Sequence, residues 1–227
     1  MRSVYVDSYC ERTAPGLWNE PLNAVSNAAF LIAAVLLFLL LRREPGRVPV
    51  SLWLLPSLIA VVGVCSWMFH MAATSPTAAL DSLSILVFIL VAAVALVHWR
   101  WGVPWSRAWV TAPAFVVFFI GVNAALFAVG GEDASMGGYL PALLALVGFG
   151  LAALRTPGEQ RGPGRILLTA AAVFVASLTL RTIDDPICGT VPIGTHFLWH
   201  CCNSVVLFLT AYAIIRSHSL RTASART

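Results

Sequence analysis

The chain contains no lysine, and charged residues make up only 11% of its 227 positions. Soluble globular domains carry about 25% charged residues, so this scarcity excludes an ordinary soluble domain. All of the positive charge comes from 14 arginines, the formal net charge is only +4, and no basic stretch with interleaved aromatic residues appears. We therefore expect no nucleic-acid partner. The residues before the first apolar run lack the apolar core of a signal peptide, so we also expect no cleaved leader.

Apolar residues are abundant instead: 59% of the chain is hydrophobic, and its mean hydropathy is +0.85. A membrane-spanning helix needs about 20 mostly apolar residues. Runs of this kind predict an all-α, polytopic membrane protein in a single domain, 1–227, with a 1–21 segment before the first helix and a 216–227 tail after the last. The seven predicted spans are Leu22–Leu41, Val50–Met71, Ala78–Val97, Ala108–Val129, Tyr139–Leu154, Ile166–Leu180 and His196–Ile215.

Arginine placement supports seven spans, although the fifth and sixth runs are short. The gaps after the first, third and fifth spans, together with the tail, hold eleven of the arginines: Arg42, Arg43, Arg47, Arg100, Arg107, Arg155, Arg161, Arg165, Arg216, Arg221 and Arg226. Because cytoplasmic loops are rich in arginine and lysine, we expect the N-terminus outside and the C-terminus in the cytoplasm. The Ala/Arg-rich, lysine-free composition suggests the inner (cell) membrane of a bacterium.

Five polar residues lie inside these spans, where they are costly and by default indicate a functional site. Ser66 and His70 end the second span, Asp81 lies early in the third, and His196 and His200 begin the seventh. The second span runs outward, whereas the third and seventh run inward. All five residues are therefore predicted to lie at one depth, in the outer half of the bundle. We expect a single site there.

The spacing of the three histidines predicts a metal site. His196 and His200 are four residues apart and share one helix face, and His70 is expected at the same depth. Three neutral imidazoles without a thiolate suit Zn²⁺ and leave its fourth position open, as in catalytic zinc sites. The structural alternative is that His70 is an interfacial histidine hydrogen-bonded to the backbone, and that the HxxxH pair binds no metal.

Asp81 and Ser66 complete the groups that amide hydrolysis needs. Asp81 lies about a turn and a half after the predicted helix cap at Ser75, too deep for capping, and is expected to act as a general base. Ser66 is expected to stabilise an oxyanion, and Asn203 to support the histidines from the next turn. The structural alternatives are an Asp81–Arg181 ion pair and a Ser66 hydroxyl bonded back to its own helix.

The segments 66–81 and 196–200, with S-x-x-x-H, the later Asp and H-x-x-x-H, resemble the alkaline ceramidase family. This family belongs to a larger group of seven-helix membrane hydrolases that includes the adiponectin-receptor-like proteins. The similarity extends from "SYCERTAPGLWNEPLNAVSNAAF" to "RTIDDPICGTVPIGTHFLWHCCN". It implies hydrolysis of ceramide-like N-acyl lipids to fatty acid and sphingoid base. It also implies zinc held by His70, His196 and His200, proton transfer by Asp81, and Ser66 near the oxyanion.

The resemblance also implies a calcium site near the N-terminus, in which the family has Asp-Trp-Cys-Glu-x-Asn and a later Glu. Glu11 and Glu20 match the two glutamates, and Tyr9 would contribute its backbone carbonyl. Oxygen ligands of this kind suit Ca²⁺. Ser8 and Thr13 stand where the family has Asp and Asn, and these departures weaken the site.

Two alternatives and one covalent link complete the expectations for this region. Glu11 could instead pair with Arg12 or Arg181. The resemblance pairs Cys10 with Cys188 in a disulfide, which an oxidising compartment would allow.

The partners expected are a membrane lipid substrate and the bilayer, and we infer no obligate protein partner. Other functions stay open: the same site acting on another lipid amide or ester, a non-enzymatic seven-helix receptor, or a haem-binding membrane protein. A transporter is disfavoured because polar residues would then continue through both leaflets.

Overall fold

The computed structural model describes residues 4–130, 138–155 and 158–224, and within these ranges the chain is an all-α bundle without a strand. Its helices are α1 (Pro21–Ser26), α2 (Ala28–Arg43), α3 (Val50–Ala72), α4 (Ser75–Trp101), α5 (Trp105–Ala108), α6 (Thr111–Gly130), α7 (Leu140–Leu154), α8 (Gly162–Thr182) and α9 (His196–Ser224). Two short 3₁₀ turns, η2 (Gly158–Arg161) and η3 (Asp185–Ile187), flank α8. The predicted all-α class is confirmed.

Six helical segments are long and apolar enough to cross a membrane: 21–43, 50–72, 75–101, 105–130, 162–182 and 196–224. The remaining predicted span, α7, has 15 residues and is therefore about 22 Å long at about 1.5 Å per residue. It is shorter than the hydrocarbon core of about 30 Å. The protein is thus a multi-pass membrane protein of seven main helices, one of them short.

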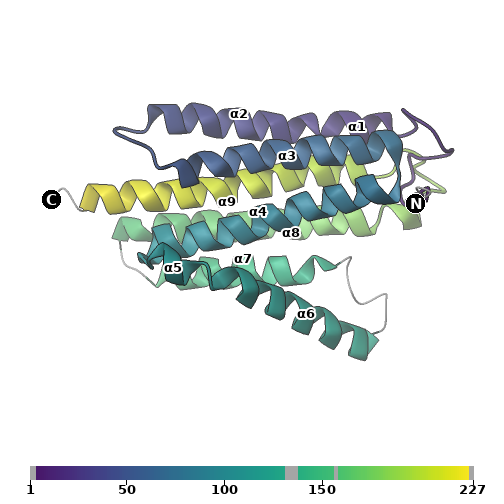
Figure 1. Ribbon diagram of the computed structural model, residues 1–227. Helices are drawn as coiled ribbons and strands as arrows, with labels where there is room; N and C mark the ends of the chain where they lie inside the picture. The colour runs from purple at the N-terminus through teal and green to yellow at the C-terminus, as the bar shows by residue number, and fades with distance from the viewer. Residues whose placement is uncertain (1–3, 131–137, 156–157, 225–227) are drawn as a thin grey trace.

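The long helices lie side by side, with the two termini at opposite ends of the bundle (Figure 1). The N-terminal segment, the α3–α4 junction and the loop before α9 gather at one end. The C-terminus, α5 and the α2–α3 connection lie at the other. α6 diverges from the bundle, and Phe115 is its one buried residue in the described part of the chain.

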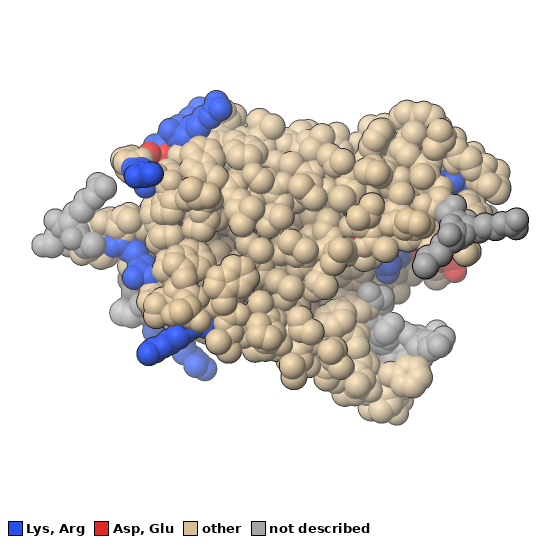
Figure 2. Space-filling view, viewed as in Figure 1, with Lys and Arg blue, Asp and Glu red and all other residues tan. Residues whose placement is uncertain are grey.

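Basic side chains gather mainly at the end that holds the C-terminus (Figure 2). The middle of the molecule presents a broad surface without charge in this view, as a surface in contact with lipid requires. The asymmetry agrees with the loop distribution of arginines in the sequence. Under the positive-inside rule this basic end would face the cytoplasm.

Some helix boundaries differ from the predicted ones. α4 is capped by Thr74, one residue before the predicted Ser75, and Thr77 completes a capping box with Thr74. α9 continues to Ser224, so most of the predicted tail is helical. The last turns of α9 contact the end of α4, where Arg221 donates a hydrogen bond to the carbonyl of His98 at 2.8 Å.

Two glycines allow short α7 to pack closely on α8. A Cβ atom placed on Gly164 would lie 2.9 Å from both the Gly150 carbonyl oxygen and the Leu154 nitrogen, which real side chains do not tolerate. Small residues permit such close backbone approach in membrane bundles, where van der Waals packing drives helix association. This contact holds the end of α7 against the start of α8.

Candidate metal centre

Three histidines meet at the end of the bundle that holds the N-terminal segment. His70 lies in the last turn of α3, His196 is the first residue of α9, and His200 lies one turn further along. Their side chains are fully enclosed, with exposed fractions of 0%, 1% and 0%. One nitrogen from each lies within 4.8 Å of the other two, a grouping that could hold a metal ion. The structure therefore brings together the three histidines predicted from the sequence.

Hydrogen bonds fix the orientation of two of these rings. The Nδ1 of His70 lies 2.5 Å from Glu20 Oε2, so the Nδ1–H donates to the carboxylate. The Ser26 hydroxyl donates to the Asn23 carbonyl at 2.9 Å, so it accepts from the Nδ1–H of His200 at 2.7 Å. In both rings Nε2 is left as the atom with a free lone pair, the arrangement that partners beyond the metal ligands impose on histidine.

The free nitrogen atoms have no partner among the described residues. His70 Nε2, His196 Nδ1 and His200 Nε2 are all buried without a hydrogen bond. About 90% or more of buried polar groups are hydrogen-bonded in proteins, so an unpartnered nitrogen on each of three neighbouring rings requires an explanation. A metal ion with a preference for nitrogen ligands supplies one.

Two aromatic rings enclose His196. Tyr9, from the N-terminal segment, stacks on it with ring centroids 3.6 Å apart, and Trp199 stacks with centroids 5.0 Å apart. Burial raises the pKa of the Tyr9 phenol, which therefore stays protonated. The first 20 residues thus form part of the wall of the site.

Ser66 lies one turn before His70 on the same helix and is 1% exposed. Its Oγ has no hydrogen-bond partner among the described residues. Serines elsewhere in the helices do bond back to their own helix, for example Ser217 to the carbonyl of Ala213 at 2.8 Å. The expected alternative role for Ser66 therefore does not describe its geometry, and its hydroxyl lies beside the Asp81 carboxyl group instead.

Asp81 approaches the histidines from α4. Its carboxyl group is close enough to His70, Ser66 and Arg181 to interact with them electrostatically. Its Oδ1 atom is buried without a hydrogen-bond partner in the described part of the chain. The alternative ion pair between Asp81 and Arg181, both of them described residues, is not formed. Arg181 instead lies over the Tyr139 ring, 5.1 Å from its centroid.

Asp184, which sequence reasoning missed, anchors the start of α9. Its Oδ1 accepts hydrogen bonds from the backbone N–H groups of Thr195 at 2.6 Å and His196 at 2.8 Å. Its Oδ2 accepts from Cys10 N–H at 3.1 Å, and Cys10 forms the disulfide with Cys188 that the resemblance implied. No periodic pattern marks Asp184, because its loop is irregular.

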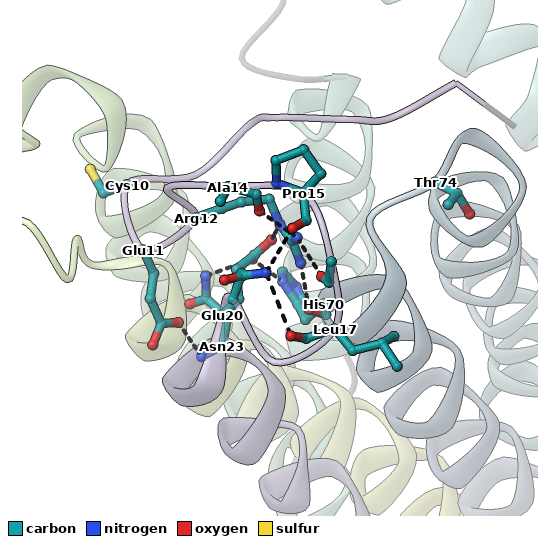
Figure 3. Close-up of polar contacts among 12 residues, drawn as sticks. Cys10, Glu11, Arg12, Ala14, Pro15, Leu17, Glu20, Asn23, His70 and Thr74 are labelled. Carbon is teal, nitrogen blue, oxygen red and sulfur yellow. Dashed lines mark hydrogen bonds and ion pairs between the residues drawn. The ribbon is translucent and has the colours of Figure 1, made fainter.

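The residues expected to bind calcium are engaged by other groups, and Figure 3 shows this for Glu11 and Glu20. Glu11 accepts backbone N–H groups at the start of α1 on both oxygens, at 2.6 and 2.8 Å. The Tyr9 carbonyl accepts the N–H of Arg12 at 3.1 Å. Glu20 accepts from Arg12 on one oxygen and from His70 and Asn23 on the other. The positively charged Arg12 guanidinium occupies Glu20 Oε1 and would repel a divalent cation there, so the residues as arranged do not fit calcium.

The Glu20 carboxylate is buried, with 1% of its surface exposed. Burial opposes ionisation, yet hydrogen bonds from His70 and Arg12 hold the pKa of the Glu20 carboxyl below its usual range. Glu20 is therefore an anion at neutral pH. The alternative in which Glu11 pairs with Arg12 is wrong, since Arg12 pairs with Glu20 instead.

A partly open apolar pocket of about 80 Å³ lies between α4, α6, α7, α8 and α9. Asn203, expected to support the histidines, lines its wall together with residues such as Phe88, Leu146, Phe174 and Leu207 from α4, α7, α8 and α9. Asn203 lies less than one turn after His200 on α9, so the pocket begins one helical turn from the histidines. Its apolar lining suits contact with a lipid chain.

Comparison with known proteins gives one positive finding. A search of curated proteins finds no match to this chain. The family model described as Ceramidase matches residues 8–226, nearly the whole chain.

Proposed function

We propose, from the premise that this chain belongs to the ceramidase family, that it is a zinc-dependent hydrolase of the amide bond in ceramide-like N-acyl lipids. Membership over nearly the whole chain makes the protein an amide hydrolase; zinc and a ceramide-like substrate are the proposed parts. The observation that carries them is the set of three orphaned imidazole nitrogens near an apolar pocket in a membrane bundle.

His70, His196 and His200 are the proposed zinc ligands. The three available donors are nitrogens, and the free cysteines nearest in sequence, Cys201 and Cys202, are not part of the grouping that could hold a metal. When bound, zinc supplies Lewis acidity, which activates water at neutral pH and polarises a carbonyl.

Asp81 is the proposed proton-transfer group. Its unpaired Oδ1 would accept a proton from the water that attacks the amide carbonyl carbon, and the carboxyl would then deliver it to the nitrogen as the C–N bond breaks. The products are a fatty acid and a free amine. The Ser66 hydroxyl, which has no partner of its own, would donate to the oxygen on which negative charge develops.

The apolar pocket and the ends of the bundle support a position for the substrate. An acyl chain that contacts the apolar lining near Asn203 would bring its amide toward the histidines, at the level where lipid chains meet head groups. The site lies at the end of the bundle opposite the basic one, beside the Cys10–Cys188 disulfide. Disulfides form in oxidising compartments, so we place the active site on the extracytoplasmic side of a bacterial cell membrane.

The test is incubation of purified, zinc-loaded protein with a panel of N-acyl and O-acyl lipids, followed by mass spectrometry of the products. We expect equimolar fatty acid and sphingoid base from N-acyl sphingoid lipids, and none from metal-stripped protein. Cleavage confined to another lipid amide or to an ester would redirect the substrate assignment. No cleavage together with a visible Soret band would replace the hydrolase with a haem protein.

Metal analysis tests the ligands separately from the reaction. His196→Ala removes one of three protein ligands, so zinc affinity is expected to fall by well over about tenfold. Stoichiometric zinc in a variant that lacks His70, His196 and His200 together would remove these residues from the assignment.

A further inference from the structure

Arg12 is buried in the N-terminal segment, with 4% of its surface exposed. Its Nε–H donates to Glu20 Oε1. Its terminal nitrogens donate to three backbone carbonyls: Gly16 at 3.1 Å and Ala14 at 3.4 Å from one, and His70 at 2.8 Å from the other. Figure 3 shows the guanidinium enclosed between this loop and the end of α3. Every one of these partners is an oxygen.

An environment of one carboxylate and several carbonyl oxygens is the kind that hard cations prefer. The guanidinium offers five N–H donors in a fixed planar fork and is always charged at physiological pH. It therefore satisfies the same oxygens with directed hydrogen bonds. Glu20 and Arg12 carry opposite single charges, so the buried charge is balanced without an ion.

We propose that the Arg12 guanidinium is a built-in cation that takes the place of a bound calcium ion. It holds the N-terminal loop closed and positions Glu20, which in turn orients His70 through its Nδ1–H. Arg12 also fixes the His70 backbone carbonyl, so it holds this residue at two points. The effect on His70 rests on the proposed metal centre, whereas the independence from calcium does not.

A divalent cation beside the Arg12 guanidinium is disfavoured in this geometry. Like charges repel strongly when both are shielded from water, and Arg12 is almost fully buried. The carbonyl of Tyr9 and both oxygens of Glu11 already accept backbone N–H groups. Calcium at Glu20 would therefore have to displace Arg12 and share the remaining oxygens with these N–H groups.

The first experiment uses the wild-type protein in detergent, with thermal unfolding recorded in EGTA and in excess CaCl₂. A specific site occupied at about 100 times its Kd would raise Tm by about 5–11 °C for a chain of this length. We expect no such shift, and no saturable ⁴⁵Ca²⁺ binding. Saturable calcium binding, or a calcium-dependent rise in Tm of this size, would overturn the proposal, and both measurements use only the wild-type protein.

The second experiment compares Arg12→Ala with Thr13→Ala, its exposed neighbour in the same loop. Removing the guanidinium frees Glu20 Oε1 and three carbonyl oxygens, so Arg12→Ala is expected to gain a calcium-dependent rise in Tm that Thr13→Ala lacks. If Arg12→Ala folds but gains no response to calcium, the loop is not a cation position and the replacement is refuted.

Zinc affinity tests the positioning of His70. Loss of a residue that orients a metal ligand typically costs about 10–100-fold in metal affinity, and we expect this loss in Arg12→Ala and in Glu20→Gln. Arg12→Lys keeps the positive charge but loses the planar set of N–H donors, so its zinc affinity should lie between those of wild type and Arg12→Ala. If Arg12 acts through Glu20, the double variant is no worse than the worse single one. Additive losses, or wild-type zinc affinity in Arg12→Ala, would contradict the positioning role. These readouts involve no substrate, so they are independent of the reaction proposed above.

Discussion

Replacing Asp184 with asparagine is expected to loosen the start of α9 and the N-terminal segment together. The buried carboxylate accepts three backbone N–H groups: those of Thr195 and His196 on one oxygen, and that of Cys10 on the other. Asp184→Asn preserves the shape of the side chain but leaves only one acceptor oxygen. Whichever way the amide turns, its NH₂ group faces a backbone donor.

The magnitude follows from these contacts. If the remaining oxygen keeps Thr195 and His196, the bond to Cys10 is lost, and a charge-assisted bond is worth about 1.5–3 kcal/mol. The two donors left facing each other in a buried site cost about 1–3 kcal/mol more. The two remaining bonds also weaken, because the acceptor is no longer charged. We expect a loss of about 3–5 kcal/mol, or about 6–20 °C in Tm for a chain of this length.

The assay is thermal unfolding in detergent with EDTA present, so that a bound metal does not mask the loss, and without reductant, so that the disulfide stays intact. Asp185→Asn is the matched control, because the next residue is exposed and its side chain makes no hydrogen bond within the described part of the chain. Equal unfolding temperatures for Asp184→Asn and Asp185→Asn would refute the reasoning.

Three further substitutions test the metal centre. Asp81→Asn is expected to lower kcat by about 10²–10⁴ with zinc content unchanged, because general acid–base catalysis is worth this much; near wild-type turnover would remove Asp81 from the chemistry. Ser66→Ala should cost up to about 10²–10³ in kcat, the scale of one oxyanion donor, and a change confined to KM would contradict that role. Ser26→Ala removes the acceptor of the His200 Nδ1–H, so zinc affinity measured by competition with a chelator should fall about 10–100-fold. The control Ser57→Ala removes only an exposed bond to its own helix and should leave zinc affinity intact.

Hydropathy predicted the helices well, because a lipid environment demands long apolar runs wherever the backbone crosses it. The fifth and sixth runs were both short in the sequence. In the structure the sixth extends to the 21 residues of α8, whereas the fifth, α7, stays too short to cross on its own. Helix ends were less accurate: Thr74 caps α4 instead of Ser75. Both residues are good caps by type, so the local sequence alone does not choose between them.

The grouping of the histidines was also within reach of the sequence. Residues four apart share a helix face, and alternating span directions put His70 at the same level as His196 and His200. The resemblance added the Cys10–Cys188 link. These predictions depend only on local periodicity, on the order of spans and on a matching motif.

The sequence by itself therefore determined the membrane class, the helices and the depth of the three histidines. These follow from the lengths of the apolar runs, the helical period and the order of the spans. The tertiary structure alone decided that Glu20 and Ser26 orient two of those histidines, and that Asp184 anchors the third. It also placed Arg12 where the motif suggested calcium. The physical reason is that the segments around residues 4–20 and 183–195 are irregular: their positions are set by side-chain hydrogen bonds and a disulfide to distant residues, and no local period encodes such contacts.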